Sequence, residues 1–65
     1  MERKMTKEFM INVLVEFWGD VLRVRQENGD DKEAVAMFTG FAFAALHSGL
    51  REIDVQAAMA SARND

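Results

Sequence analysis

The feature that most constrains this fold is an uncharged run from Ala34 to Leu46 in a chain of only 65 residues. Thr39 is the single polar side chain in the run, and on a helical wheel its large apolar side chains point in nearly every direction. A helix that is apolar all round is normally buried. A chain of this length buries only about 60% of the surface of its unfolded form. We therefore expect this segment to need more cover than one small domain supplies.

The remaining sequence has the spacing of helices. Proline is absent, and no segment alternates apolar and polar residues over the length of a strand. The first helix is predicted over 6–28, with Thr6 as N-cap and the Asn28-Gly29 pair as stop signal. The expected fold is all-α, one domain over 1–65, in which a long helix, a buried hydrophobic helix and a short C-terminal helix form three elements.

The second and third helices are placed by their capping signals. The second is predicted over 31–47 and opens with Asp30 as N-cap and Glu33 three residues later, an aspartate form of the capping box. Ser48-Gly49 ends it. The third is predicted over 54–63, with Asp54 as N-cap. We expect the first two helices to form an antiparallel hairpin, which the third covers on one side.

The apolar faces exceed what three helices can cover among themselves. The first helix carries a second apolar stripe, and the second helix has small residues every four positions, which permit close helix approach. Without cysteine, no disulfide compensates for a small core. Large apolar patches usually mark interfaces, so we expect a homo-oligomer, most simply a dimer. The residues predicted to mediate self-association are Ile11, Val15, Trp18, Leu22, Ala36, Gly40 and Ala44.

The charge balance indicates the kind of partner. The net charge is −3, and it arises in residues 29–65, which hold six acidic and three basic side chains, whereas residues 1–28 hold five of each. This balance disfavours nucleic acid, which is bound through basic faces. An acidic rim instead favours a protein partner with a basic surface, whose identity the sequence leaves open. The residues predicted to bind it are Asp30, Asp31, Glu33, Glu52 and Asp54.

Signals for catalysis or for a cofactor are weak. His47 and Ser48 are neighbours in sequence, which is not the geometry of a nucleophile and its base. No cysteine is present to ligate zinc, and His47 is the one histidine. At the end of the second helix, His47 is expected to stabilise the helix dipole. We predict no catalytic, metal or cofactor site and no enzyme activity.

Two other function classes remain open. The aromatic residues could line a pocket between subunits for a small ligand such as a nucleotide, with an arginine meeting its phosphate. The rings concerned are Phe17, Trp18, Phe38, Phe41 and Phe43, and the arginines are Arg23, Arg25 and Arg51.

The other class is a helix-turn-helix regulator that binds nucleic acid, with 54–63 as its recognition helix. That segment contains a single basic residue, Arg63, and it begins with Asp54, which phosphates would repel. Basic residues gather instead at Arg3, Lys4 and Lys7.

Localisation is inferred from what the sequence lacks. The longest uncharged run reaches Leu50 and contains His47, so it is a poor match to the roughly 20 apolar residues of a membrane span. A secretory signal is not visible either. We expect a cytoplasmic protein that does not contact membranes. Its size and lack of motifs are typical of accessory proteins of phages and mobile elements.

Overall fold

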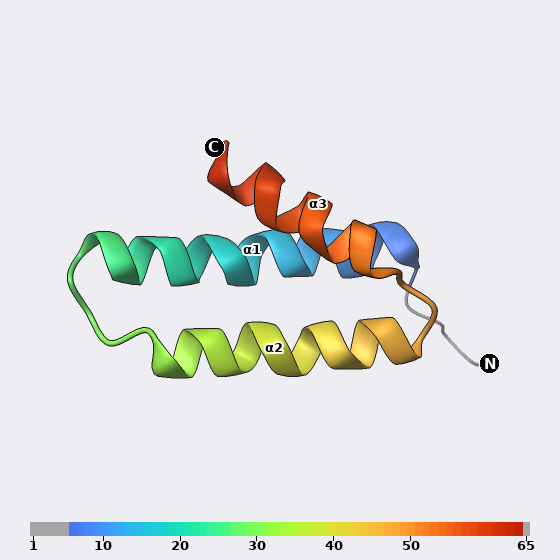
Figure 1. The fold of residues 1–65 in the computed structure, drawn as a ribbon, viewed down its shortest axis with the longest axis horizontal. Coiled ribbons are helices and arrows are strands. Elements are labelled where there is room, and N and C mark those ends of the chain that lie inside the picture. The colour runs from blue at the N-terminus through green and yellow to red at the C-terminus, as the bar shows by residue number, and fades with distance from the viewer. Residues whose placement is uncertain (1–5, 65) are drawn as a thin grey trace.

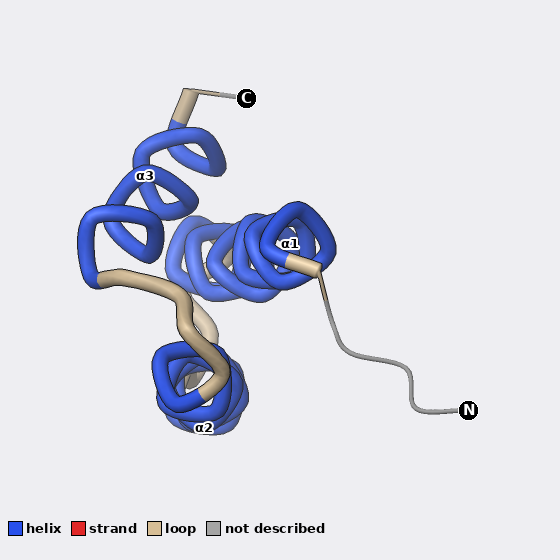
Figure 2. The backbone as a smooth tube through the Cα atoms, turned by 90° about the vertical axis from the view of Figure 1, so that its right-hand side faces the viewer, coloured by secondary structure: helices blue, strands red, loops and turns tan. Residues whose placement is uncertain are grey.

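Residues 6–64 are described by a computed structural model. They form three helices and no strand: α1 (Lys7–Gln26), α2 (Lys32–His47) and α3 (Glu52–Arg63). Figure 1 shows α1 and α2 side by side as an antiparallel hairpin, with α3 folding back over α1. In Figure 2 α1 lies between the other two helices, and both pack against it. The all-α prediction and the expected hairpin are confirmed.

Both ends of α1 follow from local sequence. Thr6 is the N-cap, and its Oγ1 accepts a hydrogen bond from the Phe9 N–H at 3.0 Å. At the other end Asn28 adopts a positive φ of 59°, and the Gly29 N–H donates to the Val24 carbonyl at 2.9 Å. This is the Schellman arrangement, which satisfies the last carbonyls of a helix. The predicted start and stop signals are confirmed.

The start of α2 differs from the predicted capping box. Asp31, not Asp30, is the N-cap residue, and its carboxylate pairs with the Arg25 Nε at 2.6 Å. Asp30 accepts a hydrogen bond from the Lys32 N–H at 3.0 Å. Aspartate readily bonds the backbone two residues ahead, and this local bond moves the helix start one residue beyond the predicted N-cap.

The connection from α2 to α3 is also a Schellman turn. Gly49 has a φ of 111°, and the Leu50 N–H donates to the Ala45 carbonyl at 3.0 Å. The turn buries Leu50 in the core, so it fixes where α3 begins. The helix starts at Glu52, two residues before the predicted boundary. Asp54 therefore lies inside its first turn and is not the N-cap.

The core lies where the three helices meet around α1. It contains Met10, Leu14, Phe38, Ala45, Leu50 and Ala58. Val55 and Met59 of α3 pack against this cluster, as expected for a helix that covers one side of the hairpin. Aromatic side chains join α1 to α2: the Phe17 and Phe41 rings meet edge to face at 5.8 Å, and the Trp18 and Phe38 rings lie 5.0 Å apart.

The second helix is not buried as its composition predicts. Only Phe38 and Ala45 of α2 are buried. Burial of this helix was predicted together with self-association. Within the single chain α2 lacks cover because α3 packs on α1 and makes few contacts with α2. The α2 surface that points away from α1 is exposed.

Candidate functional site

The exposed side of α2 combines apolar side chains with a strip of small residues. Ala36, Gly40 and Ala44 are exposed along it. Large side chains flank the strip, with Met37 52% exposed and Phe43 61% exposed. We call this surface, together with the polar residues at its two ends, the α2 outer face: it comprises Glu33, Ala36, Met37, Gly40, Phe43, Ala44 and His47.

The small strip is open. Apart from its chain neighbours and the adjacent backbone of its own helix, a Cβ placed on Gly40 would meet no atom of residues 6–64 within 4 Å. Met37 and Phe43 were not among the predicted self-association residues. Their positions on the helical wheel, to either side of the small strip, were the signal that would have included them. The outer face therefore presents a strip of small residues between two large apolar side chains.

The predicted self-association residues of α1 lie in a different environment. Ile11, Val15 and Trp18 are half-buried and pack against the core cluster. Val15 also lines a groove with Ala62 of α3, and Leu22 is half-buried. The chain's own helices thus cover much of this stripe. Of the two predicted groups, the structure leaves the α2 residues free to contact another molecule.

The acidic residues near the α1–α2 turn form one side of a groove. Asp30 and Glu33 line it together with Asp20, Arg23 and Met37, and its volume is about 300 Å³. Sequence reasoning missed Asp20 as part of this site. It is brought there by the antiparallel pairing of α1 with α2. Arg23 pairs with Asp20, which leaves Asp30 and Glu33 as the acidic groups available at the groove.

The other predicted acidic residues are not part of that groove. Asp31 is paired with Arg25, while Glu52 and Asp54 lie at the start of α3. Figure 1 shows the start of α3 and the α1–α2 turn at opposite ends of the hairpin. The 16 residues of α2 separate them by about 24 Å. The five acidic residues therefore do not form one continuous rim.

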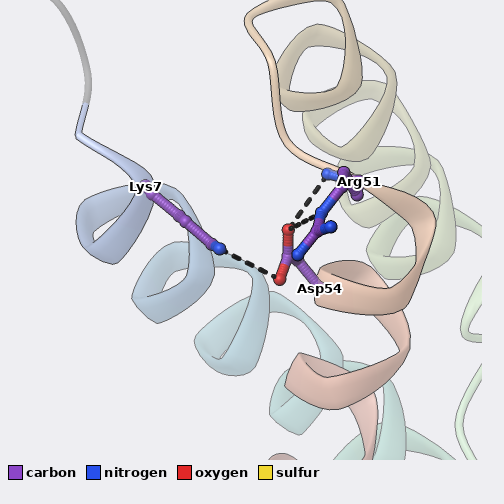
Figure 3. Close-up of polar contacts among 3 residues, drawn as sticks. All are labelled: Lys7, Arg51 and Asp54. Carbon is purple, nitrogen blue, oxygen red and sulfur yellow. Dashed lines mark hydrogen bonds and ion pairs between the residues drawn. The ribbon is translucent and has the colours of Figure 1, made fainter.

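Asp54 has a structural role in the fold. Its carboxylate accepts a hydrogen bond from the Arg51 N–H at 3.1 Å and lies 3.5 Å from the Lys7 Nζ (Figure 3). The pKa of Asp54 is lowered, first by the backbone hydrogen bond from Arg51 and then by the nearby charge of Lys7, against the opposing effect of desolvation. Asp54 thus joins the start of α3 to the start of α1.

Most of the residues predicted for a small-ligand pocket or for nucleic-acid binding make contacts within the fold. Four of the five aromatic rings pack between α1 and α2, and only Phe43 is exposed. The Arg25 guanidinium lies 5.5 Å from the Trp18 ring centre and pairs with Asp31. For the helix-turn-helix alternative, Lys7 pairs with Asp54, and Arg3 and Lys4 lie outside the described residues.

His47 is exposed at the last position of α2. Across residues 6–64, no three histidine, aspartate or glutamate side chains come together as metal ligands would. In the same part of the chain, no helix has the combined length and apolar character needed to cross a membrane.

Comparison with known proteins gives no assignment. No protein family model matches this sequence, and no curated protein or solved structure is significantly similar to it.

Proposed function

We propose that this protein is a non-catalytic interaction module that self-associates through the α2 outer face and binds a second protein through the acidic groove. The observation that carries the proposal is the exposure of the α2 outer face. The α2 helix carries no charge from Ala34 to Leu46, yet it packs only one side against the rest of the described chain. Patches of this kind on small proteins usually mark interfaces.

The free energy available at this face is substantial. At 61% exposure, Phe43 leaves roughly 100–150 Å² of apolar surface in water. Burying that surface would contribute about 3 kcal/mol per copy before the entropic cost of association. Met37, with 52% exposed, adds to it. A second copy of the chain brings an equally apolar face, so a homodimer supplies the missing cover.

Light scattering over a dilution series tests self-association. We expect a mass of twice 7.4 kDa at high concentration that falls toward the single-chain mass on dilution. Phe43→Ser should shift this transition to higher concentration and leave the helical circular dichroism signal unchanged, because the side chain is exposed. Ser61→Ala, on the exposed surface of α3, is the control that should not shift it. A single-chain mass at every concentration would refute the homodimer.

The acidic groove is the proposed site for a basic segment of a partner protein. Asp30 presents its carboxylate beside the apolar Phe17 and Val24, a combination that suits a lysine or arginine side chain with its alkyl stem. Glu33 and Met37, at the edge of the groove, belong to the α2 outer face. A lysine-rich peptide is a suitable probe, and its binding should weaken as salt is raised.

The matched variants for this test are Asp30→Asn in the groove and Glu52→Gln at the far end of the hairpin. Each removes one negative charge. We expect Asp30→Asn to weaken peptide binding and Glu52→Gln to leave it nearly unchanged. Equal losses in both variants would mean that the peptide responds to net charge and not to the groove.

A further inference from the structure

The α2 outer face has an internal symmetry centred on Gly40. Each of its residues has a counterpart at the same distance on the other side of Gly40: Ala36 with Ala44, Met37 with Phe43, and Glu33 with His47. Small is matched with small, large with large, and acid with base. All seven residues are exposed. A surface with this arrangement is complementary to itself when one copy is turned end over end.

We infer that two copies of the chain pair through antiparallel α2 helices, with Gly40 of each copy at the two-fold axis. This inference rests on the proposed self-association and specifies its geometry. A symmetric dimer uses the same patch on both subunits, so residue i of one copy meets residue j of the other, and the reverse. About the Gly40 axis, each residue then lies level with its counterpart in the second copy.

The apolar contacts fit this geometry. On the α2 helix, Phe43 lies to one side of Gly40 and Met37 to the other. In the antiparallel pair Phe43 rests over Ala36 and Gly40 of the second copy, and Met37 rests over Ala44. Each large side chain thus meets small residues. Gly40, whose Cβ position is open, lets the two helices approach closely at the axis.

The charges select the antiparallel orientation. Gly40 is seven residues from Glu33 and seven from His47, about 10 Å along the helix in each direction. A crossing angle near 20° keeps two helices adjacent over that length. Glu33 of one copy then lies beside His47 of the other at both ends of the interface. A parallel pair would instead place Glu33 beside Glu33, which is repulsive.

Single-cysteine cross-linking tests the orientation, because the natural chain contains no cysteine. Ala36→Cys and Ala44→Cys each change one exposed small residue. In the antiparallel pair, residue 36 of one copy and residue 36 of the other are offset along the helix axis by the length of eight residues, about 12 Å. This distance is beyond the reach of a disulfide. Positions 36 and 44 of different copies lie level with each other.

We expect neither variant to form disulfide-linked dimers alone, whereas an equimolar mixture should link about half of its dimers, the share of mixed pairs under random exchange. Ala57→Cys on the exposed surface of α3 is the control. Mixed with Ala44→Cys, it should not cross-link. Light scattering of the unmixed variants shows separately whether they dimerise.

The outcomes separate the two proposals. Linking of Ala36→Cys with itself, in a protein that dimerises, would refute the antiparallel geometry and leave self-association standing. Dimers without any cross-link in the mixture would place the interface elsewhere and also refute the inference. A single-chain mass throughout would refute both proposals.

Charge exchange gives an independent measurement. His47→Glu alone should weaken the dimer by about 3- to 10-fold at pH 7, since it places a second carboxylate beside Glu33 of the other copy at both ends of the interface. The double variant, Glu33→Lys with His47→Glu, puts opposite charges across the two copies and should recover most of the affinity. A double variant as weak as His47→Glu alone would contradict the pairing.

Discussion

Replacing Gly40 with alanine distinguishes a single chain from the antiparallel pair. Gly40 lies within α2 and Gly19 within α1. Apart from the chain neighbours and the adjacent backbone of the same helix, a Cβ at either position meets no atom of residues 6–64 within 4 Å. In the isolated chain both Gly40→Ala and Gly19→Ala should therefore stabilise the fold by about 0.8–1.0 kcal/mol, the helix-propensity difference between the two residues. For a domain of this size, that raises the melting temperature by roughly 4–8 °C.

In the dimer, the substitution at Gly40 is expected to be destabilising, whereas the substitution at Gly19 stays stabilising. Gly40→Ala places two methyl groups against each other at the axis, where the helices are closest. Overpacking of this kind costs about 1–3 kcal/mol, which is roughly a 5- to 150-fold weakening of dimerisation. Gly19→Ala lies outside the α2 outer face and leaves dimerisation unchanged. Gly19 is thus a matched control, because it has the same helix-propensity gain and no interface contact.

The assay combines urea unfolding at several protein concentrations with light scattering. At concentrations where the chain is monomeric, the two variants should be equally stabilised. Where the natural chain is dimeric, only Gly19→Ala should remain more stable than the natural protein. Equal stabilisation by both variants at every concentration, with equal dimer dissociation constants, would refute close helix approach at Gly40.

Three further predictions test the single-chain fold. Gly49→Ala should lower the unfolding free energy by about 1–2 kcal/mol, since φ at this turn is 111°; urea midpoints measure the loss, and an unchanged midpoint would contradict a strained position. Leu14→Ala should cost about 2–5 kcal/mol because the side chain is fully buried, whereas Phe9→Ala, at a position 51% exposed, should cost far less; similar losses would contradict the assigned core. The pKa of Asp54 is lowered in the folded protein, so its stabilising contribution is present above the ordinary aspartate pKa and disappears as the pH falls through the folded value. Asp54→Asn should therefore reduce stability at pH 7 and flatten the stability loss below about pH 4, and a pH series of urea midpoints as steep as that of the natural chain would contradict this role.

Local sequence signals located most helix ends because each end depends on a few neighbouring residues. Thr6 caps α1 through its own hydroxyl, and Asn28 ends it by adopting a positive φ. The start of α2 was misplaced by one residue because Asp30 and Asp31 are both good caps. Asp30 bonds the Lys32 N–H two residues ahead and Asp31 pairs with Arg25 across the turn, so the helix begins after Asp31.

Which apolar surface stays exposed to solvent depends on packing between residues that are far apart in the sequence. The sequence predicts more apolar surface on α1 and α2 together than a three-helix chain can cover. It does not show where α3 settles. The Schellman turn at Gly49 buries Leu50 and directs α3 onto α1, so the stripe containing Val15 is partly covered and the strip around Gly40 is left exposed.

The sequence by itself thus determined the helical class, the three segments and the excess of apolar surface, because composition and spacing are local properties. Only the tertiary structure decided which part of that excess faces solvent and which acidic residues share a groove. The reason is physical: an apolar side chain is equally stabilised by any neighbour that excludes water. The covering neighbour is chosen by turn geometry and by the packing of the whole chain.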